Sequence, residues 1–144
     1  MIYTELTKKA LKICFDAHKD DTDKSGMPYV FHPFHVAEQM DDEVSTIVAL
    51  LHDVVEDHPD KYPFEVLEGM GFGDEAMEAL RFLTHQEGES YMDYVREIRK
   101  NPIARKVKLA DLAHNSDSDR LDTITPKDEE RIEKYKAAQK TLQE

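Results

Sequence analysis

The sequence predicts an all-α fold, a compact helical bundle of about seven to eight helices. Apolar residues recur at helical spacing through nearly the whole chain, and no stretch shows sustained alternation of apolar and polar residues. The six prolines and five glycines fall mostly between these periodic segments. With 144 residues, the chain fits one domain, residues 1–144, which can fold without disulfides or structural zinc.

The first half of the chain is predicted to contain three helices, at about 4–18, 33–41 and 44–57. A polar loop, 19–27, follows the first helix. Pro33 suits the first turn of the second helix, and Asp42 can cap the third. The third segment is the most apolar in the chain, so we expect it to form the centre of the core, buried on most sides.

The second half is predicted to contain five helices, at about 64–70, 74–83, 91–100, 101–119 and 126–142. Ser90, with Asp93 three positions on, marks the start of the third of these. Pro102 and Pro126 occupy first-turn positions of the last two. The final amphipathic helix is expected either to pack on the core or to pair with another subunit, so a homo-oligomer is one of the expected states.

Composition restricts the classes of function. The chain carries 31 acidic and 19 basic side chains, a net charge of -12, which disfavours a nucleic acid partner. It lacks a secretory signal pattern and any apolar run approaching the ~18 residues of a membrane span. Its one cysteine, Cys14, lies in an apolar periodic stretch and is expected to be a buried, inert thiol. A cytoplasmic protein with no membrane partner is expected.

Four ionisable residues interrupt the apolar third helix: His52, Asp53, Glu56 and Asp57. Burying such groups without partners costs several kcal/mol, and residues four apart lie one above the other on a helix. A bound metal with a reactive water would compensate them. The alternative is that they mark where the helix emerges into solvent, but two acids at a helix C-terminus oppose the macrodipole by about 0.3–1 kcal/mol each.

Two other segments offer further ligand-type side chains. His32 precedes Pro33, which favours an extended backbone and fixes the direction of the imidazole. Asp111 shares a helix face with Lys108 and Asn115, although a solvated polar stripe would give the same pattern. The other histidines, His18, His35, His58 and His85, are expected to be packing or surface residues.

Taken in order, these motifs resemble those of the HD-domain metal-dependent phosphohydrolases, and in particular the (p)ppGpp hydrolase branch of the RelA/SpoT-like family with its small alarmone hydrolases. The matching elements are Ala17-His18, Lys24-Ser25-Gly26, Pro28-Tyr29, His32-Pro33, Leu50–Asp57, Lys108–Asp111 and His114-Asn115. The eight-residue element 50–57 is far more specific than a lone His-Asp pair.

The resemblance implies a role for each residue of the motifs. The metal ligands would be His32, His52, Asp53 and Asp111, and the metal manganese. Glu56 and Asp57 would act on the attacking water, and Lys24, Ser25 and Asn115 would line the nucleotide pocket. Lys108, which shares a helix face with Asp111, is expected from its charge to contact a phosphate or to hold Asp111 or Glu56. Two imidazoles and two carboxylates by themselves suit Mn, Fe, Co or Zn and do not select among them.

The expected reaction is hydrolysis of the 3′-diphosphate of guanosine alarmones, from ppGpp or pppGpp to GDP or GTP and pyrophosphate. Two departures weaken the assignment of a guanine nucleotide substrate: Asp23 stands where a basic residue usually precedes Lys24, and Leu112 stands where an arginine follows the aspartate. They leave open an HD phosphohydrolase acting on another nucleotide or on the 2′-phosphate of NADPH. A third hypothesis is a non-catalytic module that senses nucleotide.

Overall fold

The computed structural model describes all residues 1–144 and contains nine α-helices, one short 3-10 helix and no β-strand, which confirms the all-α prediction. The helices are α1 (Glu5–His18), α2 (Phe31–Glu38), α3 (Glu43–Leu51), α4 (Val54–Asp57), α5 (Phe64–Glu68), α6 (Asp74–Phe82), α7 (Tyr91–Ile98), α8 (Pro102–Asn115), η1 (Ser118–Arg120) and α9 (Pro126–Gln143). No helix is long and apolar enough to cross a membrane.

Short polar side chains start most of the longer helices where the sequence predicts it. The side chains of Asp42 and Ser90 accept hydrogen bonds from backbone N–H groups in the first turns of α3 and α7. Thr125 and Asp128 form a reciprocal capping box at α9, with Pro126 in the first turn. The observed helix limits follow from these local signals together with the apolar periodicity.

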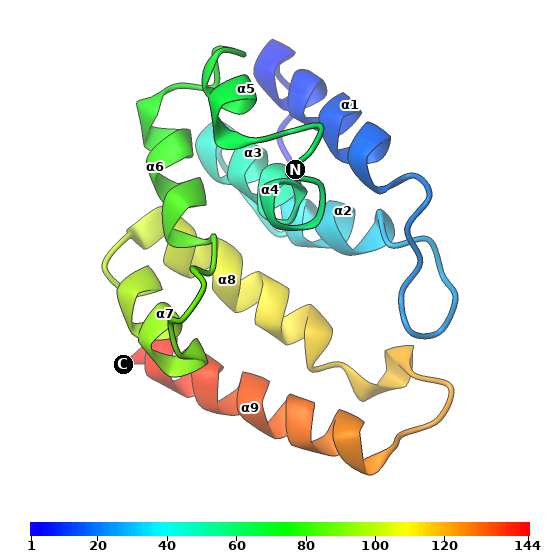
Figure 1. Ribbon diagram of the computed structural model, residues 1–144. Helices are drawn as coiled ribbons and strands as arrows, with labels where there is room; N and C mark the ends of the chain where they lie inside the picture. The colour runs from blue at the N-terminus through cyan, green and yellow to red at the C-terminus, as the bar shows by residue number, and fades with distance from the viewer.

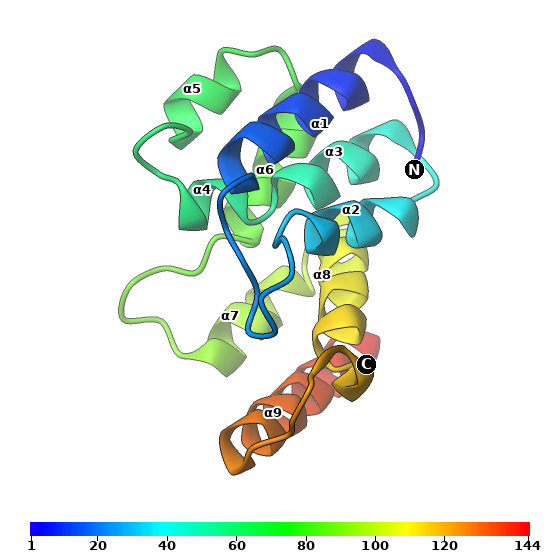
Figure 2. The same ribbon diagram turned by 90° about the vertical axis from the view of Figure 1, so that its right-hand side faces the viewer.

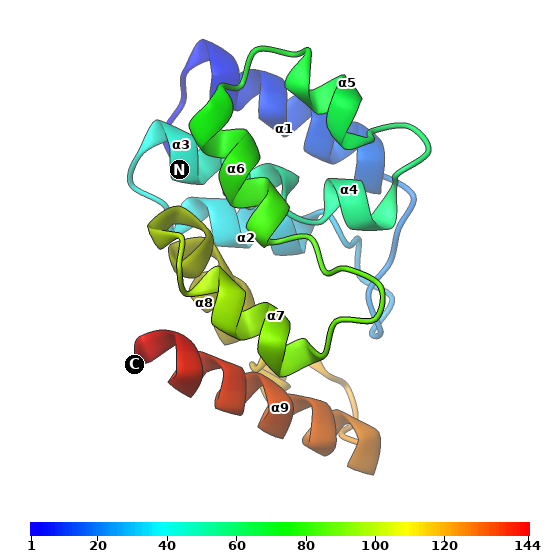
Figure 3. The same cartoon turned by 60° about the vertical axis from the view of Figure 1, so that its left-hand side comes forward.

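Helix α3 lies at the centre of the bundle and contacts α1, α2, α6 and α8 (Figure 1). Its residues from Ser45 to Leu51 are all buried. Helices α7 and α9 pack on each other and on α8, at the other end of the molecule from α1 (Figure 3). Ala138 and Leu142 of α9 are fully buried in the same core, so the last helix packs on its own chain.

The predicted third helix, 44–57, is wrong in one respect: it is two helices, broken at His52 and Asp53. The backbone of Asp53, at φ -100° and ψ -6°, departs from the ideal values of an α-helix, and the hydrogen bonds resume from Asp57 N–H to the Asp53 carbonyl. Neighbouring side chains on a straight α-helix point about 100° apart. The break instead brings the side chains of His52 and Asp53 together.

The predicted helix 101–119 is shorter than expected. Helix α8 ends at Asn115, and the Asp117 side chain accepts a hydrogen bond from the backbone of Asp119, which starts the 3-10 turn. The loop 19–30 is closed by an isolated bridge between Thr22 and Pro28. In Figure 2 this loop descends from α1 beside α8, towards the C-terminal half.

Candidate metal centre and nucleotide pocket

The four predicted ligands converge at the junction of three parts of the chain. His32 comes from α2, His52 and Asp53 from the break between α3 and α4, and Asp111 from α8. One ligand atom from each lies within 4.8 Å of all the others. We call these four residues the metal cluster.

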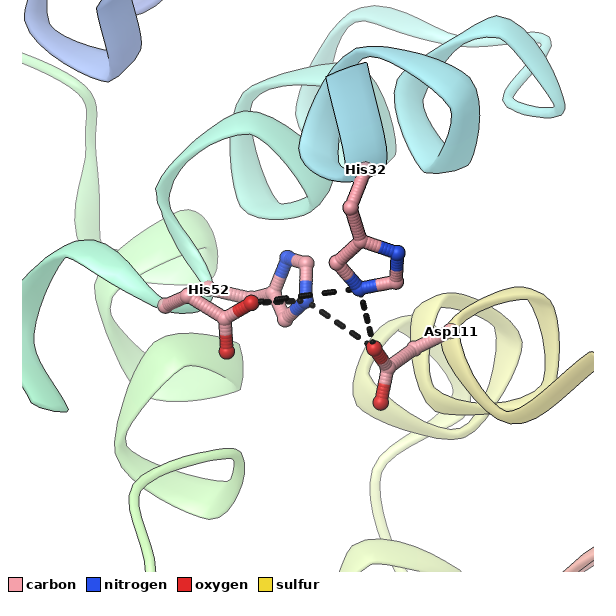
Figure 4. Close-up of side chains that lie close together, drawn as sticks. His32, His52 and Asp111 are labelled. Carbon is pink, nitrogen blue, oxygen red and sulfur yellow. Dashed lines mark hydrogen bonds and ion pairs between the residues drawn. The ribbon is translucent and has the colours of Figure 1, made fainter. Parts of the chain in front are cut away.

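Two imidazole nitrogens of the metal cluster meet one carboxylate oxygen. His32 Nε2 lies 2.7 Å and His52 Nε2 lies 3.4 Å from Asp111 Oδ1. His52 Nε2 also lies 3.1 Å from Asp53 Oδ2. Figure 4 shows His32, His52 and Asp111 pointing toward one another from their separate elements.

The metal cluster is enclosed by protein. His32, His52 and Asp111 are 2%, 5% and 4% exposed, and Asp53 is half-buried. Buried charges at this density require a compensating partner.

The proline after His32 lies inside the first turn of α2, so the helix begins two residues earlier than predicted and carries His32 on its buried face.

The electrostatic field of the cluster favours a positive charge. Burial opposes protonation of His52, yet the Asp53 and Asp111 carboxylates raise its pKa well above the usual value. Burial likewise opposes ionisation of Asp111, but Lys108 and the two histidines hold its pKa well below the usual range. Carboxylates that remain ionised in an enclosed space attract a cation as well as a proton.

Hydrogen bonds from outside the cluster orient both histidines. His52 Nδ1 lies 2.6 Å from the Ala49 carbonyl, and His32 Nδ1 lies 2.8 Å from His114 Nδ1. Burial, with Arg120 and His32 nearby, lowers the pKa of His114 to about 4, so its neutral ring can accept a hydrogen bond from His32. With Nδ1 donating in each ligand histidine, a bound metal would take the place of the proton at each Nε2, the arrangement typical of metal-binding histidines.

The carboxylates are held in the same way. Tyr29 Oη donates to Asp53 Oδ2 at 2.6 Å. Lys108 Nζ lies 2.9 Å from Asp111 Oδ2, and Asn115 Nδ2 donates to Asp111 Oδ1 at 3.2 Å. The cluster fits a divalent ion of mixed nitrogen and oxygen ligation, because all four side chains present donor atoms and are supported by a surrounding shell.

Glu56 and Asp57 lie beside the metal cluster and not within it. Both reach solvent and border a cavity of about 680 Å³, which is lined by Asp20, Asp21, Thr22, Tyr29, Glu56, Asp57 and His58. The Glu56 carboxylate accepts a hydrogen bond from the backbone N–H of His85. Partial burial, with Asp53 and Glu56 close by, raises the pKa of Asp57 to about 6. Such a carboxyl can exchange a proton near neutral pH.

A second cavity, of about 340 Å³, contains three of the predicted substrate-binding residues. We call it the basic pocket; its lining is Thr22, Asp23, Lys24, Ser25, Tyr29, Asn115, Asp117, Arg120, Leu121, Arg131 and Tyr135. Ser25 Oγ donates to the Arg120 carbonyl at 3.0 Å, and Arg120 Nη1 donates to Asn115 Oδ1 at 3.3 Å. Thr22 and Tyr29 border both cavities, so the pocket adjoins the space beside Glu56 and Asp57.

The structure separates Lys108 and Leu112 from this pocket. Lys108 is mostly buried, pairs with Asp111 and lies over the Tyr94 ring, which matches the second of its two predicted roles. Leu112 is fully buried in the hydrophobic core and does not line the pocket. Asp23 does line the pocket, 3.8 Å from Arg120.

Sequence reasoning missed several contributors to the site. His114 lies three residues after Asp111 on α8, a spacing at which it could have been assigned to the same helix face, whereas Tyr29 precedes α2. Arg131 and Tyr135 come from α9, and no local sequence pattern links them to the site.

Cys14 is fully buried as predicted, and burial raises the pKa of its thiol to about 12.

The fold and the metal cluster define the class of the protein, an HD-type domain. No family model matches the sequence. The bifunctional (p)ppGpp synthase/hydrolase SpoT of Escherichia coli strain K12 is 32% identical over 137 residues, covering 87% of this chain and 19% of SpoT. The guanosine-3′,5′-bis(diphosphate) 3′-pyrophosphohydrolase of Haemophilus influenzae is 31% identical over 135 residues, covering 85% of this chain and 20% of the relative.

A solved structure extends the likeness to the whole chain. It is described as a metazoan ortholog of SpoT that hydrolyzes ppGpp and plays a role in starvation responses. The two are 26% identical with a TM-score of 0.74, and the match covers 99% of this chain and 85% of the other. The chain belongs to the SpoT-like family of HD-type hydrolase domains, and it spans about a fifth of the length of the curated relatives it matches.

Proposed function

We propose that this protein hydrolyses the 3′-diphosphate of guanosine alarmones, converting ppGpp or pppGpp to GDP or GTP and pyrophosphate. The observation that carries the proposal is the enclosed cluster of His32, His52, Asp53 and Asp111, flanked by two carboxylates and adjoining a pocket with basic side chains. A SpoT ortholog described as hydrolysing ppGpp shares the fold over nearly the whole chain. We further propose that residues 1–144 act as one hydrolase unit in the cytoplasm.

The metal cluster would hold a divalent ion, which we propose is Mn²⁺. When bound, such an ion polarises a phosphoryl oxygen and lowers the pKa of coordinated water. His114 and the Ala49 carbonyl keep the two ligand imidazoles in the tautomer that binds through Nε2. Lys108 and Tyr29 hold the two aspartates in place.

Glu56 and Asp57 act on the attacking water. In the proposed reaction, water adds to the phosphorus attached to the ribose 3′-oxygen, the bond between that phosphorus and the 3′-oxygen breaks, and pyrophosphate leaves. One proton passes from the water to a carboxylate, and the 3′-oxygen takes up a proton. Asp57, with its pKa of about 6, is the better matched proton acceptor at neutral pH.

The basic pocket binds the nucleotide. Lys24, Arg120 and Arg131 place positive charge around it, against the net charge of -12 of the whole chain. Ser25 and Asn115 support this wall through Arg120. Arginine suits paired contacts with phosphate oxygens.

The direct test is incubation of metal-stripped protein with ppGpp and a series of divalent ions, with pyrophosphate release as the readout. Turnover should appear with Mn²⁺, and a chelator should abolish it. The absence of turnover with every ion tested would refute the substrate assignment.

One observation favours a second candidate, hydrolysis of another nucleotide or of the 2′-phosphate of NADPH. The Asp23 carboxylate stands in the wall of the basic pocket, where it pairs with Arg120 at 3.8 Å and leaves less positive charge for a purine diphosphate. A panel of ppGpp, pppGpp, nucleoside phosphates and NADPH separates the two candidates. The preferred substrate is the one with the highest kcat/KM.

A further inference from the structure

A second group of ligand-type side chains lies outside the metal cluster. It consists of His18 at the end of α1, Asp21 in the following loop and His58 just after α4. One ligand atom from each lies within 4.8 Å of the others. His58 Nε2 lies 2.6 Å and His18 Nδ1 lies 3.1 Å from Asp21 Oδ2. We call these three residues the second cluster.

The second cluster repeats the geometry of the metal cluster. In both, two imidazole nitrogens from separate elements converge on a single carboxylate oxygen, Asp21 Oδ2 here and Asp111 Oδ1 there. The two clusters are neighbours, because the Tyr29 ring lies 5.1 Å from the ring of His18 and 5.7 Å from that of His32. A simple packing histidine needs neither a carboxylate nor a second imidazole at this distance.

Two properties of the second cluster favour a ligand. His18 is completely buried, and its Nδ1, the nitrogen that faces the cluster, has Asp21 as its polar partner. Burial also lowers the pKa of His18, so the imidazole stays neutral, and an ion bound at Nδ1 would leave the ring proton on Nε2. Asp21 and His58 are about one-third exposed, so an ion can reach the group from solvent.

The surroundings supply the charge that a cation requires. Asp21 and His58 line the cavity of about 680 Å³ together with Asp20, Glu56 and Asp57. The four carboxylates on this wall have no lysine or arginine among the lining residues. A cation at the second cluster would offset this negative charge beside Glu56 and Asp57.

We propose that His18, Asp21 and His58 form a second divalent-cation site, separate from the metal cluster, that takes an ion of borderline softness such as Co²⁺, Zn²⁺ or Mn²⁺. Two imidazoles and one carboxylate leave coordination positions open for water or a phosphate oxygen. With fewer protein ligands and more solvent contact, this site should bind its ion more weakly than the metal cluster.

The test counts ions and needs no substrate. Metal-stripped protein is titrated with Co²⁺ while bound ions are measured by equilibrium dialysis and by visible absorption. The wild-type chain should bind two ions, and Asp21→Asn and His58→Gln should each raise the dissociation constant of the weaker ion at least about tenfold. Asp20→Asn is the matched control, because Asp20 borders the same cavity outside the second cluster, and it should leave both ions bound.

A third variant assigns the ions. His52→Ala should remove the tighter ion and leave the weaker one. A wild-type stoichiometry of one, or an Asp21→Asn variant that still binds two ions with unchanged affinity, would overturn the second site. Because dialysis does not depend on turnover, failure of ppGpp hydrolysis with two ions bound would refute the proposed function and leave this inference standing. Thermal unfolding of each variant identifies any loss of binding that comes from misfolding.

Discussion

The metal cluster and the basic pocket are built in different ways. The cluster is held by side chains on α2, on α8 and at the break between α3 and α4, and each ligand has a second contact that fixes it. The pocket is lined by surface segments, namely the loop after α1, the turn around η1 and one face of α9. Lys24 on its rim is 64% exposed at the side chain.

This difference predicts how the metal cluster and the basic pocket should respond to mutation. A buried cluster with a complete supporting shell cannot relax around a missing ligand, so its variants should lose function almost completely. An open pocket with several charged groups shares the binding energy among them, so single substitutions there should have graded effects. Activity should therefore fall steeply for changes at the metal cluster and only mildly for changes at the pocket.

The largest effect is expected for a metal ligand. His52→Ala removes one imidazole from the proposed metal site, and such a site supplies several kcal/mol of transition-state stabilisation, so kcat/KM for ppGpp should fall by at least about 10³-fold. Metal content measured after dialysis should fall with it. A variant that kept both its metal and its turnover would show that His52 is not a ligand.

The next effect is expected at the carboxylates beside the cluster. Asp57→Asn removes a proton acceptor, and general base catalysis contributes about 10²–10⁴-fold, so kcat should fall within this range while bound metal is retained. Asp60→Asn is the matched control, because Asp60 is exposed and lines neither cavity. If metal content fell in parallel with activity, Asp57 would be acting on the ion site and not on water.

The pH profile tests the same carboxylate independently. Partial burial and the neighbouring charges of Asp53, Glu56 and Asp21 raise the pKa of Asp57 to about 6, against the opposing effect of His58. Below pH 6 the protonated group cannot accept a proton, so kcat/KM should decline about tenfold per pH unit as the pH falls.

The raised pKa of Asp57 also affects stability. Asp57 favours the folded state below its pKa in the unfolded chain, 3.8, and loses this contribution as the pH rises through 6.

A smaller effect is expected from the shell around the metal cluster. His114→Ala removes the acceptor that orients His32, and such outer contacts are worth about 10–100-fold in metal affinity. His35→Ala is the control, because His35 stacks on the His114 ring at 4.0 Å and is exposed. Mn²⁺ titration of the two variants should separate them. Equal losses of affinity would mean that packing of the three rings, and not the hydrogen bond to His32, supports the site.

The sequence predicted the features of the fold and site that depend on residues close together in the chain. Periodicity and capping residues such as Ser90 and Thr125 located the helices to within a few residues, because these signals are local. The adjacent pair His52 and Asp53 identified the centre of the site, since ionisable groups in an apolar run need compensation. His32 and Asp111 could be joined to that pair only through the family resemblance.

The features that the sequence did not predict depend on how segments far apart in the chain pack together. The break at His52 brings the neighbouring side chains of His52 and Asp53 to the same metal cluster. Helical periodicity in the sequence does not reveal such a break. Arg131 and Tyr135 reach the pocket only because α9 packs against α7 and α8. The grouping of His18 with His58 requires the loop after α1 to meet the end of α4, 40 positions along the chain, so neither histidine attracted a functional assignment.

The smallest effect, and the one that tests the pocket most directly, is expected at Asp23. Its Oδ1 accepts the backbone N–H groups of Ser25 and Met27, and Asp23→Asn keeps an oxygen for those bonds while removing the charge that faces Arg120. If the pocket binds phosphate, the freed Arg120 should lower KM for ppGpp about 2–5-fold with kcat unchanged, in the range typical of a partly exposed ion pair. Asp122→Asn, an exposed neighbour outside the pocket, should change neither constant. An increase in KM would instead indicate that the Asp23 carboxylate accepts hydrogen bonds from the base, and the pocket would then recognise the nucleobase by Asp23 and not the phosphates by Arg120.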